Sequence, residues 1–121
     1  MAARKIGGTA FLKKDGKQLL AKGSWSYGLG TPEREGQLGI DGFHGYTEKP
    51  TIAFLEGDIT DYAELNLKEE LGNFVNGTIT LELANGKTIL LNEAYSAKPV
   101  EGETEEGKIS VRFEGTSAEE I

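Results

Sequence analysis

Apolar and polar residues alternate in short runs along most of the chain, which is the pattern of strands that bury one face. In the run 108–114, Ile109, Val111 and Phe113 alternate with polar side chains and are expected to face inward. Such runs, bounded by turn residues, predict strands near 8–13, 17–22, 24–29, 50–57, 75–84, 87–96 and 108–114. The protein is therefore predicted to be mainly β.

Three glycine-containing turns precede such runs. They are Asp15-Gly16-Lys17, Asn85-Gly86-Lys87 and Glu106-Gly107-Lys108. Asp-Gly and Asn-Gly supply the positive φ angles of two-residue hairpin turns. We therefore predict hairpins at these places.

A two-residue turn at Asn85-Gly86 also sets a register for the strands on either side of it. It pairs Leu81 with Leu90 on one face and Glu82 with Ile89 on the other. Both faces then carry aliphatic side chains, whereas a sheet with one wet face alternates cleanly. We expect the second face to be covered, either by the helix or by another subunit.

One short helix is predicted within 61–72. Either Asp61 or Asn66 can cap its start, and Glu69 follows Asn66 by three residues, as in a capping box. Gly72 is expected to end it.

The segment 31–49 is a long, glycine-punctuated loop with no periodicity of its own. Connections of this length in a small domain are usually functional or disordered. Its apolar and aromatic side chains argue against a solvated linker, because they need a surface on which to be buried. A partner surface is the place we expect, and the candidate contacts are Leu38, Ile40, Phe43, His44 and Tyr46.

Length and charge narrow the possibilities further. The 121 residues are expected to form a single domain, 1–121. A formal net charge of −7 argues against a general nucleic-acid binder, because such binding depends on lysine and arginine. Residues 1–30 carry six cations against Asp15, while residues 101–121 carry seven glutamates against two cations. We expect these regions to attract each other, within one fold or between copies, and 116–121 to form a flexible tail.

The sequence contains no cysteine, and its first residues lack the apolar run of a signal peptide. No apolar stretch approaches the length that spans a membrane. We therefore expect a protein made and folded in the cytoplasm of its host, without disulfides and without a membrane partner.

Candidate catalytic groups are few. His44 is the only histidine, and a contact in the loop explains it better than catalysis. Gly86-Lys87-Thr88 ends like a phosphate-binding loop, but Leu81 stands where that motif needs glycine. Asp58 and Asp61 could supply oxygens to a metal, although capping explains Asp61 without one. We predict no catalytic, metal or cofactor site.

Short motifs follow one another in a recognisable order through nearly the whole chain. They include Ile6-Gly7-Gly8-Thr9-Ala10, Lys22-Gly23-Ser24-Trp25-Ser26-Tyr27, Gly39-Ile40-Asp41-Gly42-Phe43-His44-Gly45-Tyr46 and Gly57-Asp58-Ile59-Thr60-Asp61, and then residues 78–87, 92–95, 105–108 and 112–115. Each motif alone is common in β-turns. In their order, spacing and total length they resemble the Mu-like phage tail tube proteins.

The resemblance implies a β-sandwich or barrel with one helix, acting as a structural subunit and not as an enzyme. Six copies would close into a ring whose inner strands form a continuous barrel, and rings would stack into the tube through which phage DNA passes. It also implies a place in the virion tail, beside sheath, tape-measure, baseplate and tail-terminator proteins. Type VI secretion tubes share this architecture, so the fold alone does not fix the machine.

Two other function classes remain as alternatives. A monomeric β-barrel module could close its loop over a small ligand with Phe43, Tyr46 and Trp25, which predicts an apolar pocket. A small hydrolase could use Asp58 and Asp61 as a carboxylate pair. Self-association distinguishes the tube subunit from the ligand-binding module, because only the tube requires it.

Overall fold

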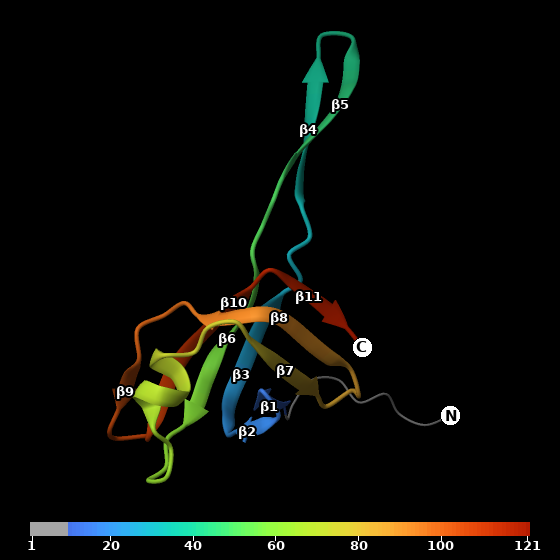
Figure 1. Cartoon of the computed structure of the whole chain (residues 1–121). Helices are drawn as coiled ribbons and strands as arrows, with labels where there is room; N and C mark the ends of the chain where they lie inside the picture. Colours follow the sequence, from blue (N-terminus) through green and yellow to red (C-terminus); the bar gives the residue numbers. More distant parts are fainter. Residues whose placement is uncertain (1–9) are drawn as a thin grey trace.

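The computed structural model describes residues 10–121, which form two β layers and a hairpin that stands out from them (Figure 1). The strands are β1 (Ala10–Lys14), β2 (Lys17–Leu19), β3 (Ala21–Gly28), β4 (Glu33–Gly39), β5 (Gly42–Lys49), β6 (Ala53–Thr60), β7 (Gly77–Leu83), β8 (Thr88–Ser96), β9 (Glu101–Glu103), β10 (Lys108–Gly115) and β11 (Ser117–Glu120). The helical element of this part of the chain is η1 (Lys68–Gly72). The predicted mainly β fold is confirmed.

The main sheet runs in the order β2-β1-β7-β8-β10-β6-β3, with β9 added to β10 and β11 added to β8. Strand β8 connects the two layers, because its residues 89–92 pair with β11 while Tyr95 and Ser96 pair with β10. Every pairing is antiparallel. The sheet thereby folds over on itself into a sandwich, with β2 and β3 at the two ends of the strand order and with β9 and β11 each paired on one side.

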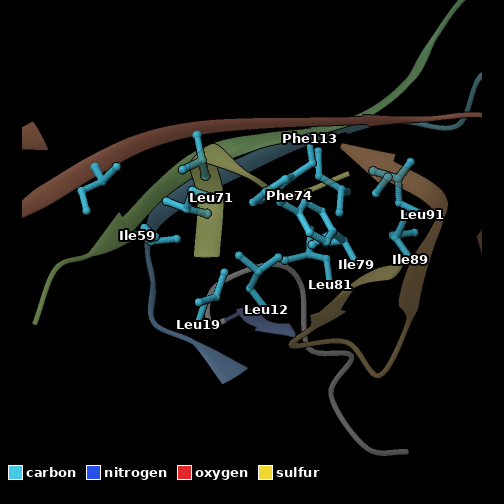
Figure 2. Packing of buried hydrophobic residues seen from close by; sticks show 14 of the residues in the cluster. Leu12, Leu19, Ile59, Leu71, Phe74, Ile79, Leu81, Ile89, Leu91 and Phe113 are labelled. Atoms are coloured by element: carbon cyan, nitrogen blue, oxygen red, sulfur yellow. The ribbon is translucent and has the colours of Figure 1, made fainter. Parts of the chain in front are cut away.

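One apolar core fills the space between the layers (Figure 2). Ile109, Val111 and Phe113 of β10 face it, as predicted. The Phe74 ring meets the Phe113 ring edge-on, with centroids 5.7 Å apart and planes at 90°. The remaining fully covered side chains come from both layers and from η1: Leu12, Leu19, Leu55, Ile59, Leu71, Ile79, Leu81, Ile89, Leu91 and Ala94.

The hairpin β7–β8 differs from its prediction by one residue of register. Its loop has three residues, 84–86, because the Leu83 N–H donates to the Lys87 carbonyl oxygen at 2.7 Å and the Gly86 N–H donates back to Leu83. Leu81 therefore lies opposite Ile89, and not opposite Leu90. Since a shift of one residue moves a strand's side chains to the other face, the aliphatics of β7 and most of those of β8 gather on the core side. The prediction of two aliphatic faces was wrong. The structure therefore gives no reason to expect the helix or another subunit over the second face of this hairpin.

The turn between β1 and β2 has the predicted two-residue form. Asp15 and Gly16 take φ angles of +50° and +85°, and Lys14 pairs with Lys17 across them. The Asp15 carboxylate also accepts the Thr78 N–H at 2.8 Å, which fixes this turn to the start of β7.

The predicted helix is shorter than expected and is not α-helical. Only Lys68–Gly72 is helical, and the Asn73 N–H reaches back five residues to the Lys68 carbonyl oxygen at 3.0 Å. Of the two candidate caps, Asn66 makes the contact, since its side-chain oxygen accepts the Glu69 N–H at 3.3 Å. Among residues 10–121 no helix has the length and apolarity to cross a membrane.

Several strand limits also differ from those predicted. The strands expected at 17–22, 24–29 and 50–57 are found at Lys17–Leu19, Ala21–Gly28 and Ala53–Thr60, and residues 8 and 9 of the first predicted strand lie outside the described residues.

The flexible tail predicted at 116–121 was wrong. Residues Ser117–Glu120 form β11, and the Ile121 N–H donates to the Thr88 carbonyl oxygen at 2.8 Å.

Candidate assembly hairpin

The segment 31–49 holds an antiparallel hairpin whose register shifts once, between Gln37 and Leu38, so the irregular loop predicted there was wrong. Strands β4 and β5 pair from Glu33 with Lys49 to Gly39 with Gly42. Because β4 follows β3, β5 leads into β6, and β3 pairs with β6, this ribbon continues an edge of the sandwich outward. In Figure 1 it projects well clear of both layers. We call β4–β5 the assembly hairpin.

The tip of the assembly hairpin is held by its own side chains. The His44 ring lies over Gly39, where a Cβ atom would collide with it. His44 Nε2 is also 2.5 Å from the Asp41 carboxylate. His44 therefore makes a contact within the tip, as expected from its place beside Phe43. At the base, the Thr51 hydroxyl donates to the Thr31 carbonyl oxygen at 2.5 Å.

The apolar side chains of the hairpin lie in solvent. Leu38 is 80% exposed, Phe43 67% and Tyr46 59%, and Ile40 is fully exposed. Leu38 and Phe43 lie directly opposite each other across the two strands. A two-stranded hairpin is marginally stable on its own in water, and large exposed apolar patches mark interaction sites. The hairpin thus has the exposed apolar side chains expected of a docking element.

Trp25 does not join the hairpin aromatics. Its indole N–H donates to the Asp58 carbonyl oxygen at 3.1 Å, and its ring covers Gly57 within the sandwich. Phe43 and Tyr46 lie on the projecting ribbon, so the three aromatic residues of the predicted ligand pocket are not brought together (Figure 1). A hollow of about 670 Å³ exists elsewhere, lined by residues 61–67 alone.

The two aspartates singled out in the sequence have structural contacts. The Asp58 carboxylate accepts the Ser110 hydroxyl at 2.9 Å across the β6–β10 pair. The backbone N–H of Asp61 donates to the Gly107 carbonyl oxygen at 2.8 Å. Within residues 10–121, no three His, Cys, Asp or Glu side chains converge as a metal site would require.

An ion-pair cluster that the sequence did not indicate lies on the outer side of β6 and β10. The Arg112 guanidinium donates to Glu114 at 2.8 Å and to Glu56 at 2.6 Å, and lies 4.3 Å from the centroid of the Phe54 ring. The Tyr95 hydroxyl donates to the other Glu114 oxygen at 3.0 Å. The hydrogen bond from Arg112 lowers the pKa of Glu114, and the bonds to Glu114 and Glu56 raise the pKa of Arg112. This cluster is called the Arg112 cluster below.

The basic and acidic regions approach each other inside one chain, but their described residues, within 10–30 and 101–121, form no ion pair with each other. The Lys22 ammonium donates to the Glu106 carbonyl oxygen at 2.8 Å. Other basic residues of the first region are paired differently, because Lys14 and Lys17 both contact Glu70, at 3.0 and 2.9 Å. A contact between these regions of different copies stays a prediction.

Comparison with known proteins agrees with this fold. Residues 3–120 match the model of the phage tail tube protein family. The Mu-like prophage FluMu tail tube protein of Haemophilus influenzae is 30% identical over 96 residues, which are 79% of this chain and 80% of that protein.

Two solved structures share the fold at low sequence identity. One is the PVC sheath/tube terminator of an extracellular contractile injection system in its extended state, with a TM-score of 0.66, 8% identity and coverage of 93% of this chain and 92% of that chain. The other is the tube terminating cap of the anti-feeding prophage, with a TM-score of 0.69, 11% identity and coverage of 100% and 94%. The family match and the FluMu relative confirm the resemblance drawn from the motifs: the chain belongs to the phage tail tube protein family, in its Mu-like group.

Proposed function

We propose that this tail structural subunit assembles through its hairpin into six-membered rings, and that the rings stack into a hollow conduit for phage DNA. The observation that carries the proposal is the projecting hairpin with its exposed apolar tip. Family membership gives the chain a structural role in the tail, and we infer that it works by assembly and not by catalysis.

Burying the apolar side chains of the hairpin can contribute enough free energy to support association between copies. Fully burying one large apolar side chain contributes about 1.5–3 kcal/mol. Leu38, Ile40, Phe43 and Tyr46 are all available on each copy. Association costs several kcal/mol in lost freedom, so a single docked tip gives modest affinity. Many identical contacts in a closed ring and a stacked tube raise the total.

The shape of the molecule favours open-ended assembly. A projecting hairpin that docks on a different surface of the next copy makes a head-to-tail contact, and such contacts build rings or filaments. Strand β3 is an edge of the sheet among the described residues. Pairing edges between copies in a closed ring would remove this exposed edge.

The finished tail would place this subunit among other proteins. We infer partners of the sheath, tape-measure, baseplate and tail-terminator types, a location in the virion tail and synthesis in the bacterial cytoplasm. DNA would pass through the lumen without specific binding. The acidic net charge of −7 supports this, since phosphate binding depends on lysine and arginine.

Hairpin substitution tests the proposal. The double variant Phe43→Ser and Tyr46→Ser should give a folded monomer that makes no tubes. A matched control, Leu20→Ser and Val75→Ser, removes two exposed apolar side chains from other surfaces and should still assemble. Light scattering after size exclusion, with negative-stain microscopy, measures both. Normal tubes from the hairpin variant would refute the role of the hairpin, and wild-type rings that never stack would indicate a terminator instead.

A further inference from the structure

The outer surfaces of the two layers of the sandwich differ in chemistry. Residues that pair across neighbouring strands have their side chains on the same side of the sheet. The pairings therefore show which residues of each strand point away from the core. The outer surface of β3, β6, β9 and β10, called the charged face, carries Lys22, Ser26, Phe54, Glu56, Asp58, Glu101, Glu103, Lys108, Ser110, Arg112 and Glu114. Carboxylates outnumber cations on it.

The outer surface of β1, β7, β8 and β11 is less charged. This surface, called the neutral face, carries Phe11, Lys13, Thr80, Glu82, Thr88, Leu90, Asn92, Ser117 and Glu119. Phe11 is about half exposed, and a hollow of about 380 Å³ lies between it and the β7–β8 turn. Apolar and uncharged side chains of this kind suit contact with another protein.

Each cation of the charged face is already engaged. Arg112 is held by Glu56 and Glu114 and lies over the Phe54 ring. Lys108 lies 3.5 Å from Glu106 and 3.7 Å from Glu103, and these carboxylates raise its pKa. Lys22 donates to a backbone carbonyl oxygen. A phosphate group would have to compete with these acceptors for each cation.

Arg112 is the cation of this face that is best suited to bind a phosphate group. A guanidinium binds phosphate through two parallel hydrogen bonds, and here Nε and one Nη of Arg112 already donate to carboxylates. Arg112 lowers the pKa of Glu114 further below its ordinary value, so the two carboxylates stay ionised beside the guanidinium and balance its charge at neutral pH. Repeated around a ring, one uncovered arginine per copy would present many phosphate contacts at once, and multivalent contacts strengthen binding steeply.

We propose that the charged face lines the DNA conduit, and that Glu56 and Glu114 cover Arg112 so that passing DNA is not held by its phosphates. The neutral face then turns outward, toward the protein that surrounds the tube. This inference rests on the proposed function, because it needs a tube with a lumen. Beyond that function, we specify which surface faces the DNA and which side chains prevent that surface from binding the DNA.

The test uses assembled tubes and a short fluorescent duplex DNA at low salt. In one variant, Glu56→Gln and Glu114→Gln uncover Arg112 with little change in shape. The matched control, Glu82→Gln and Glu119→Gln, removes two carboxylates from the neutral face and uncovers Lys13, which lies 3.3 Å from Glu82. A triple variant adds Arg112→Gln to the first. Tubes are pelleted, retained DNA is measured, and nuclease is then added.

The Glu56/Glu114 variant should retain at least about tenfold more DNA than wild type, lose it as salt is raised, and protect it from nuclease. The triple variant should return to the wild-type level, and the control should protect none. Retention at the wild-type level, or retained DNA that nuclease digests, would overturn the inference. If the double variant does not assemble, Glu56→Gln alone replaces it; because this variant keeps the Glu114 contact, it should retain more DNA than wild type by a smaller factor, and retention at the wild-type level would again overturn the inference. Failure of wild type to form tubes is seen before DNA is added, and counts against the proposed function instead.

Discussion

The register of β7–β8 makes a sharp prediction about two neighbouring leucines. Leu91 faces the core and is fully buried, while Leu90 points to the neutral face and is only partly covered. The register first predicted from Asn85-Gly86 would have placed Leu90 opposite Leu81, with both faces of the hairpin covered. Replacing each leucine by alanine therefore distinguishes the two arrangements.

The magnitude follows from burial. Deleting a buried leucine side chain costs about 3 kcal/mol, including the cavity it leaves. For a chain of 121 residues, 1 kcal/mol corresponds to about 4 °C in Tm, so Leu91→Ala should lower Tm by about 12 °C. Leu90→Ala should cost less than about 1 kcal/mol, or less than about 4 °C.

Unfolding is best measured in the Phe43→Ser and Tyr46→Ser background, because association would otherwise add to apparent stability. Thermal and urea denaturation followed by circular dichroism give the two differences. Equal losses, or a larger loss for Leu90→Ala than for Leu91→Ala, would refute the register.

Three further predictions concern the hairpin tip, acid stability and assembly. Gly39→Ala should force the His44 ring aside and speed amide exchange at 38–43 without changing exchange in the sandwich, and unchanged exchange at the tip would contradict the packing seen there. Hydrogen bonds from Lys17 and Lys14 lower the pKa of Glu70 below its ordinary 4.5, so its contribution to stability is present above that pH and is lost as pH falls through the lowered value. Glu70→Gln should therefore lose less stability than wild type in urea titrations between about pH 5 and pH 3, and parallel losses would argue against these ion pairs. If oppositely charged regions of different copies meet, added salt should weaken assembly in light scattering, because the Debye length is about 10 Å at 0.1 M; salt-promoted assembly would point to apolar burial alone.

The alternation of apolar and polar residues correctly predicted which side chains of β10 face the core. The turn residues did not correctly predict the register of the β7–β8 hairpin. Asp15-Gly16 forms the expected two-residue turn, whereas the similar Asn85-Gly86 belongs to a three-residue loop. Both loop lengths are compatible with such a dipeptide. The choice depends on burying Leu81 and Ile89 together, which is a property of the whole sandwich and not of the turn.

The assembly hairpin was missed as a hairpin for a related reason. Alternation is visible in a sequence when one face of a strand is buried, and neither face of β4 or β5 is buried in this chain. The sequence of β11 shows no apolar alternation either, because this strand is held in place by its backbone pairing with β8 and not by burial of apolar side chains. The exposed side chains were nonetheless recognisable from sequence as needing a partner, and their role in assembly stays a prediction.

The Arg112 cluster lay beyond sequence analysis altogether. Alternation in 108–114 correctly placed Arg112 and Glu114 on the outward side, but Glu56 lies 56 residues away along the chain. Only the register of β6 against β10, which pairs Arg112 with Glu56, brings them together.

Assembly into a hollow tube can be observed on the purified protein. Light scattering after size exclusion over a concentration series, with negative-stain microscopy of the most concentrated fraction, measures it. We expect rings or hollow tubes whose amount rises with concentration. A strict monomer at every concentration, even when preformed tail tube ends are added as an initiator, would contradict it.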